Sequence, residues 1–175
     1  EKEGSDRFVT EMAALLHDLD DWKIAAPSEE PLQRAKEWLG RMQVSLDRTA
    51  AILNVIEDIS FKGANISTPV RSVEAAVVQD ADRLDAMGAI GIARTFAYGG
   101  HKNRLIYDPA ISPVMHDDFQ AYKNSTAPTV NHFYEKLLLL KERMNTRTAM
   151  ALAQQRHQFM ESFLEQFFDE WDAKK

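Results

Sequence analysis

Cysteine is missing from this chain of 175 residues. Its absence excludes disulfide bonds, zinc sites built on thiolates and cysteine nucleophiles. No apolar run approaches the roughly 20 residues that a membrane-spanning helix needs. The first six residues are mostly charged or polar and lack the apolar core of a signal peptide. We therefore expect a cytoplasmic protein with no membrane partner.

Positive charge is also in deficit, since 21 Lys and Arg residues against 27 Asp and Glu residues give a formal net charge of −6. A polymeric nucleic acid would need a stripe of cations that neutralises many phosphates. We expect no such partner, although a local cationic pocket for one nucleotide remains open. Hydrophobic residues at 45% and charged residues at 27% are ordinary for a globular protein with a sizeable core.

Sustained period-two alternation is absent, whereas apolar residues recur at helical spacing over most of the chain. The sequence predicts an all-α single domain over residues 1–175, with a core at about 1–100 and a loop with C-terminal helices at about 101–175. The predicted helices cover about residues 5–18, 28–40, 47–59, 68–98, 129–144 and 146–171. Residues 19–30 are expected to form a solvated loop, and a hairpin over 99–107 is possible. The last helix should bury Leu152, Phe159, Phe163, Phe167 and Trp171, in the core or in a homodimer.

An ionisable pair, His17-Asp18, closes the first apolar helix. One interpretation is a hydrogen-bonded histidine at a helix end beside a solvated aspartate. The other is a metal site, because a hard divalent ion binds oxygen ligands together with one or two imidazoles. Two ligands are too few, so a third must come from elsewhere in the chain.

Three carboxylates, Asp80, Asp82 and Asp85, lie in the middle of the long predicted helix. Its apolar face would hold Val70, Val73, Val77, Leu84 and Ile92. At about 100° per residue, Asp85 falls within that face, and Asp80 and Asp82 fall near its edges. A carboxylate in a buried face needs a metal, a cation or hydrogen-bond donors. The alternative to metal binding is that Asp80 and Asp85 pair with Arg83, Arg94 or backbone donors.

The segments 13–23, around the His-Asp pair, and 81–84, around Asp82, resemble the central and final motifs of the HD-domain superfamily of metal-dependent phosphohydrolases. The longer strings 59–63, 80–91 and 96–101 resemble a subgroup of small bacterial members, some of which act on nucleoside triphosphates. The similarity extends over nearly the whole chain.

The resemblance implies an HD-type helical bundle that hydrolyses a phosphate ester or anhydride, in a nucleotide. It implies that His17, Asp18 and Asp82 bind a divalent metal, Mn²⁺ or Mg²⁺, which would polarise a phosphate oxygen and lower the pKa of a bound water. Asp21 would orient that water or bind a second metal, with a solvated loop carboxylate as an equal alternative.

Four further residues are candidate contacts to substrate phosphate: Lys62, Arg83, Arg94 and His101. Lys62 could instead be an exposed loop lysine, the two arginines could form salt bridges along the helix, and His101 could cap a turn.

A second pair, His116-Asp117, lies in a Pro-containing loop and is interpreted as unrelated to the site. His132 and His157 are interpreted as structural.

One departure from the family concerns an earlier histidine, on a helix that precedes the His-Asp helix. No histidine precedes His17, so we expect that this helix is missing from the chain; true loss of the ligand is the alternative. Such a chain is expected to bind metal poorly and to be inactive. Two other functions stay open: a nucleotide-binding or sensing module without turnover, and a purely structural helical protein.

Overall fold

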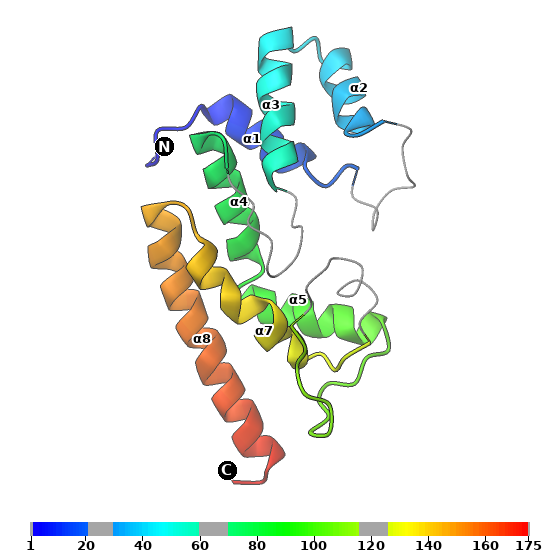
Figure 1. Ribbon diagram of the computed structural model, residues 1–175, viewed down its shortest axis with the longest axis vertical. Coiled ribbons are helices and arrows are strands. Elements are labelled where there is room, and N and C mark those ends of the chain that lie inside the picture. The colour runs from blue at the N-terminus through cyan, green and yellow to red at the C-terminus, as the bar shows by residue number, and fades with distance from the viewer. Residues whose placement is uncertain (1, 21–29, 60–69, 116–125, 175) are drawn as a thin grey trace. The chain divides into compact units, whose positions relative to one another are not determined.

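The computed structural model describes residues 2–20, 30–59, 70–115 and 126–174. Within these ranges the regular elements are seven α-helices and one 3-10 helix, with no strand (Figure 1). The all-α prediction is therefore confirmed. None of these helices combines the length and the apolarity that crossing a membrane would require.

The first of two compact units consists of Glu1–Phe61 and Thr68–Gln79. It contains α1 (Arg7–Leu16), α2 (Gln33–Arg41), α3 (Leu46–Ile59) and the first half of α4 (Val73–Asp85). Helix α3 packs against α1 and α2. The side chains that fill this core include Val9, Ala13, Leu16, Leu39, Ile52, Val55, Ile56, Ile59 and Val78.

Helix α1 begins where its sequence predicts. The carboxylate of Asp6 accepts a hydrogen bond from the backbone N–H of Val9 at 3.0 Å, which satisfies one of the donors that a helix start leaves unpaired. Val9, Ala13 and Leu16 are buried at helical spacing, so the His-Asp pair that follows is attached to a helix fixed in the core.

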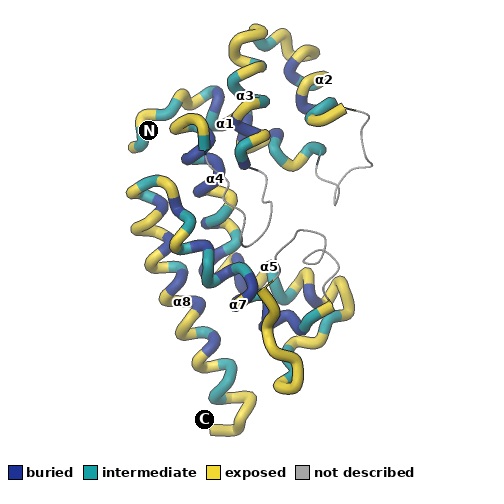
Figure 2. The backbone as a smooth tube through the Cα atoms, in the orientation of Figure 1, coloured by how far each residue is buried: buried dark blue, intermediate teal, exposed yellow. Residues whose placement is uncertain are grey.

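The second unit consists of Lys62–Ser67 and Asp80–Lys175. It contains the end of α4, then α5 (Gly88–His101), α7 (Asn131–Glu135), the 3-10 helix η1 (Leu137–Arg143) and α8 (Arg147–Trp171). Helix α8 packs against α5 and η1. Its core, blue in Figure 2, includes Leu84, Met87, Ile92, Phe133, Leu137, Leu140, Met160 and Leu164.

The single helix predicted over residues 68–98 is wrong, because α4 and α5 are separate helices. Helix α4 begins only at Val73, after Ser72, whose hydroxyl accepts from the N–H of Ala75 at 3.1 Å. Helix α5 begins at Gly88, where φ is +71° and a side chain would be strained. A Cβ on Gly91 would lie 2.3 Å from the carbonyl oxygen of Ala86, so the tight turn between the helices also needs glycine there.

The break changes which carboxylate is buried. The sequence prediction treated residues 68–98 as one helix and continued its apolar face across the turn. That face placed Asp85 inside and Asp80 at an edge. In the structure Asp80 is 3% exposed, whereas Asp85 and Val73 are exposed. The buried side of α4 is made by Ala75, Ala76, Val78, Gln79, Asp80 and Leu84.

Two boundaries after α5 also differ from the prediction. No hairpin forms over residues 99–107, all of which are described, because α5 continues through both glycines to His101. Gly99 lies against Thr129, whose Oγ1 would be 2.2 Å from a Cβ at that position. The helix predicted over 129–144 is divided into α7 and η1, since Lys136 leaves the helical region with φ −144° and ψ −58°.

Helix α8 has the predicted bounds, with Thr146 as its N-cap, but its buried side differs. Ala149, Ala153, His157, Met160 and Leu164 are buried, whereas Leu152, Phe159 and Trp171 are exposed and Phe163 and Phe167 are partly buried. The aromatic residues repeat at helical spacing, yet the helix packs through a neighbouring stripe that includes two alanines. Repetition alone did not reveal which stripe faces the core.

The turn between α4 and α5 gives a stability test. Substitution Gly91→Ala should lower the free energy of unfolding by about 1–3 kcal/mol, because the new Cβ meets a backbone carbonyl that cannot move without shifting the turn. Gly100→Ala is the matched control within the same helix, since nothing lies within 4 Å of a Cβ there. That variant should be neutral or more stable by up to about 1 kcal/mol. Urea unfolding of both variants checks the difference, and equal effects would contradict it.

Candidate functional site

His17 follows α1 directly and is its C-cap residue. Its Nδ1 lies 2.8 Å from the carbonyl oxygen of Ala14. A carbonyl can only accept, so Nδ1 must carry the proton in this hydrogen bond. The contact sets the orientation of the ring and presents Nε2 as the nitrogen available to a metal.

The Nε2 atom of His17 lies 3.3 Å from Oδ1 of Asp18, whose side chain is 59% exposed. With Nδ1 protonated, a neutral ring directs the Nε2 lone pair toward a carboxylate, which is unfavourable. An imidazolium relieves this conflict, and so does a cation bound to both atoms. Two ligand atoms that each lie about 2.1 Å from an octahedral ion are about 3 Å apart. The donor types and their spacing therefore fit two adjacent ligands of one divalent ion.

Asp20, two residues further on, has a different role. Its side chain is only 9% exposed, and its carboxylate lies 3.4 Å from the backbone nitrogens of Arg34 and Ala35 and 3.3 Å from the guanidinium of Arg34. Helix α2 has no side-chain cap of its own, so Asp20 serves that function from a distance. The prediction that residues 19–30 form a solvated loop is thus wrong at this position, and the chain after the His-Asp pair is held to α2.

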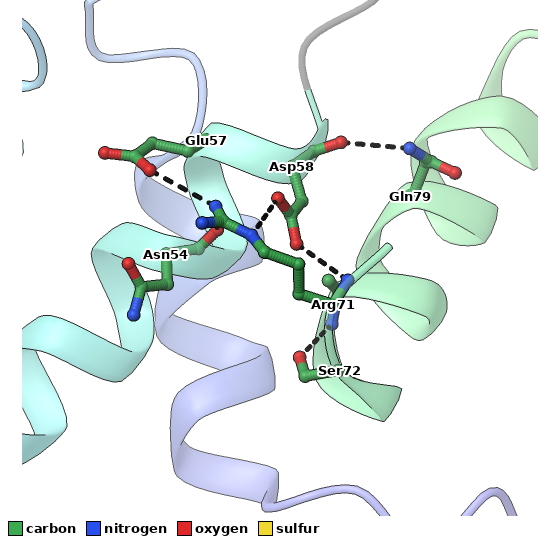
Figure 3. A network of polar contacts seen from close by, with 7 residues as sticks. Asn54, Glu57, Asp58, Arg71, Ser72 and Gln79 are labelled. Carbon is green, nitrogen blue, oxygen red and sulfur yellow. Dashed lines mark hydrogen bonds and ion pairs between the residues drawn. The ribbon is translucent and has the colours of Figure 1, made fainter. Parts of the chain in front are cut away.

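A polar network joins the end of α3 to the start of α4 (Figure 3). Asp58 accepts from Nε of Arg71 at 2.7 Å and from its backbone N–H at 3.0 Å. Arg71 also donates to Glu57 at 3.2 Å, and Gln79 donates to the Asp58 carbonyl at 3.0 Å. The hydrogen bonds to Glu57 and Asp58 raise the pKa of Arg71. The network fixes the two helices on either side of residues 60–69.

The second predicted motif lies at the end of α4, in the second unit. Asp82 is exposed there, whereas Asp80 is buried and accepts hydrogen bonds from the backbone N–H groups of Asn145 and Thr146, both at 2.8 Å. Asp85 forms an ion pair with Arg94. These contacts match the alternative in which Asp80 and Asp85 have structural partners, and Asp82 lies at an exposed position of the same helix.

The candidate phosphate contacts lie in different surroundings. Arg83 donates to the carbonyl oxygen of Arg143, and burial lowers its pKa against an opposing effect of the Asp80 charge. Arg94 is largely exposed beside Asp85. His101 is the exposed last residue of α5. Of these three, Arg83 is held by a backbone carbonyl, and Arg94 and His101 are the accessible groups.

Several predicted residues lie outside the described part of the chain: Asp21, Lys62 and the second pair, His116-Asp117. His157, predicted to be structural, is buried in α8, with Nε2 3.2 Å from Glu161. Over the described ranges, no three or more His, Asp or Glu residues come together as a metal site. Since His17 and Asp18 belong to the first unit and Asp82 to the second, the three-ligand site stays a prediction.

Comparison with solved structures identifies the family. An HD-superfamily hydrolase from Bacillus thuringiensis matches with a TM-score of 0.74 and 45% sequence identity, over 98% of this chain and 78% of that one. The chain belongs to the HD superfamily of hydrolases. At the level of the superfamily it is a metal-dependent phosphohydrolase, and the predicted HD-type fold is confirmed.

A further relative matches over similar lengths. The uncharacterized protein YpgQ of Bacillus subtilis is 38% identical over 167 residues, which cover 95% of this chain and 74% of YpgQ. The crystal structure of YpgQ in complex with ADP matches with a TM-score of 0.75 and 33% identity, over 97% of this chain and 79% of that one. No family model matches the sequence.

Two anchoring carboxylates were missed from the sequence, Asp20 and Asp58. Asp20 stands two residues after the predicted ligand Asp18, and Asp58 precedes the break after α3. Nothing in their local pattern distinguishes a capping aspartate from a solvated one, because the groups that they bind are 13 to 15 residues away.

The contact between His17 and Ala14 gives a spectroscopic prediction. In the metal-free protein, the neutral form of His17 should carry its proton on Nδ1, the tautomer that free histidine disfavours. Long-range ¹H–¹⁵N correlation spectra distinguish the two ring nitrogens directly. Exposed His101 is the internal control and should show the ordinary Nε2–H tautomer. An Nε2–H form at His17 would contradict the orientation described here.

Proposed function

We propose that this HD-superfamily hydrolase cleaves a phosphate ester or anhydride bond of a nucleotide, with a divalent ion held by His17, Asp18 and Asp82. The observation that carries the proposal is the 3.3 Å spacing of His17 Nε2 and Asp18 Oδ1 together with the fixed Nδ1. The presence of ADP in the YpgQ crystal supports a nucleotide as the substrate class.

The residues have distinct tasks in this proposal. His17 would bind the ion through Nε2, because the opposite ring nitrogen, Nδ1, is hydrogen-bonded to the Ala14 carbonyl. Asp18 and Asp82 contribute negative charge from exposed positions. One imidazole with two carboxylates suits Mn²⁺ or Mg²⁺, and such an ion lowers the pKa of a bound water and offsets charge on phosphate.

Substrate phosphate would be bound by cationic side chains. We assign this role to Arg94, His101 and Lys62, the last of them on sequence grounds. Arg83 would act less directly, since its guanidinium donates to the Arg143 carbonyl. Asp21 would orient the attacking water, also on sequence grounds.

The activity test measures nucleoside mono- and diphosphates, phosphate and pyrophosphate released from nucleoside triphosphates in the presence of Mn²⁺. His17→Ala and Asp82→Ala should each lower kcat/KM by roughly 100-fold or more, since each removes a ligand. Glu165→Ala, an exposed carboxylate on α8, is the control and should retain activity.

Two outcomes would count against the proposal in different ways. Bound metal with no product from any phosphate substrate would refute hydrolysis of phosphates. Nucleotide binding that survives EDTA, again without products, would instead support a binding or sensing module without turnover.

A further inference from the structure

Asp80 is the most thoroughly bonded buried acid in the described part of the second unit. One of its oxygens, Oδ1, accepts from the backbone N–H of Asn145 at 2.8 Å and from its side-chain amide at 2.9 Å. The other, Oδ2, accepts from the N–H of Thr146 at 2.8 Å. Hydrogen bonds to an ionised carboxylate are about twice as strong as neutral ones. Asp80 therefore attaches the last turns of α4 firmly to the residues that begin α8.

Two further hydrogen bonds join the end of α4 to η1 and to the middle of α8. The guanidinium of Arg83 donates to the carbonyl oxygen of Arg143, and the guanidinium of Arg156 donates to the carbonyl oxygen of Leu84. Together with Asp80 they form three attachments, spaced along α4 at residues 80, 83 and 84. The Asp80 and Arg83 side chains are three residues apart and share one side of the helix, and the third attachment is to the backbone carbonyl of Leu84, the next residue.

Asp82 lies between these attachments but on another side of the helix. At about 100° per residue it is rotated about 200° from Asp80, and it is exposed whereas Asp80 is buried. A helix held at one point can rotate about its axis. The three attachments, together with the Leu84 side chain in the core of the unit, oppose rotation of this end of α4 and so set the side of the helix from which Asp82 projects.

We propose that Asp80 is a positioning residue for Asp82, which it orients as a metal ligand by fixing the rotation of α4. This inference rests on the proposed function, in which Asp82 binds the ion. Loss of a residue that orients a metal ligand typically lowers metal affinity by roughly 10- to 100-fold.

The competing explanation is that Asp80 only stabilises α8 by binding the free N–H groups before it. Under that explanation its loss lowers the melting temperature but leaves metal binding of the folded protein unchanged. A double-mutant cycle separates the two, because a residue that acts only through Asp82 has no further effect once Asp82 is absent.

The experiment titrates Mn²⁺ into the wild type, Asp80→Ala, Asp82→Ala and the double variant, at a temperature where all are folded. Asp80→Ala should weaken Mn²⁺ binding by roughly 10- to 100-fold in the wild-type background and by less than about twofold in the Asp82→Ala background. Asn131→Ala is the stability control: it removes a buried 2.9 Å hydrogen bond to the Ile111 carbonyl in the same unit, and should lower the melting temperature without changing the Kd for Mn²⁺.

Asp80→Asn covers the case in which the alanine variant does not fold. Asparagine keeps an acceptor for Asn145 but turns a donor toward Thr146, so an intermediate Kd for Mn²⁺ is expected. An unchanged Kd in the folded Asp80 variants, or equal losses in both backgrounds, would overturn the positioning role. Mn²⁺ binding that does not depend on His17 or Asp82 would instead refute the proposed function itself.

Discussion

The N–H groups at the start of a helix have no partner within that helix, and an all-α protein must satisfy them at every helix. Here aspartates do so repeatedly. Asp6 binds the first turn of α1, Asp20 binds that of α2, and Asp80 binds the residues that begin α8. Apart from Asp6, these carboxylates come from distant parts of the chain. They therefore join one element to another as well as capping the start of a helix.

The acids near the two family motifs are of two kinds, one exposed and one largely buried. In each motif an exposed acid stands two residues from a largely buried one: Asp18 from Asp20, and Asp82 from Asp80. The buried member is bonded to another helix, and the exposed member remains accessible to an ion. The same arrangement in both units gives each predicted ligand a rigid attachment close by, which is what a metal site requires of its surroundings.

The surplus of negative charge also has a structural explanation in these contacts. Asp58 accepts from the guanidinium of Arg71 and Asp20 from that of Arg34, whereas Asp80 accepts from backbone and side-chain amides. The guanidinium beside Asp58 or Asp20 offsets the charge of that carboxylate locally, which weakens its repulsion of an anion. The nucleotide binding proposed above is therefore compatible with a net charge of −6.

Local sequence was sufficient for the helical class, the bounds of α1, α3 and α8, and the family, because caps and apolar spacing act over a few residues. The motifs around His17 and Asp82 were recognisable for the same reason. The break in the long helix has a local cause as well, since Gly88 takes a positive φ and Gly91 has no room for a side chain. Which acid is buried and which stripe of α8 faces the core were decided by tertiary contacts. Asp80 is buried because Asn145 and Thr146 offer it donors from 65 and 66 residues away. Contacts of that range leave no periodic signal in the sequence, so only the folded chain could specify them.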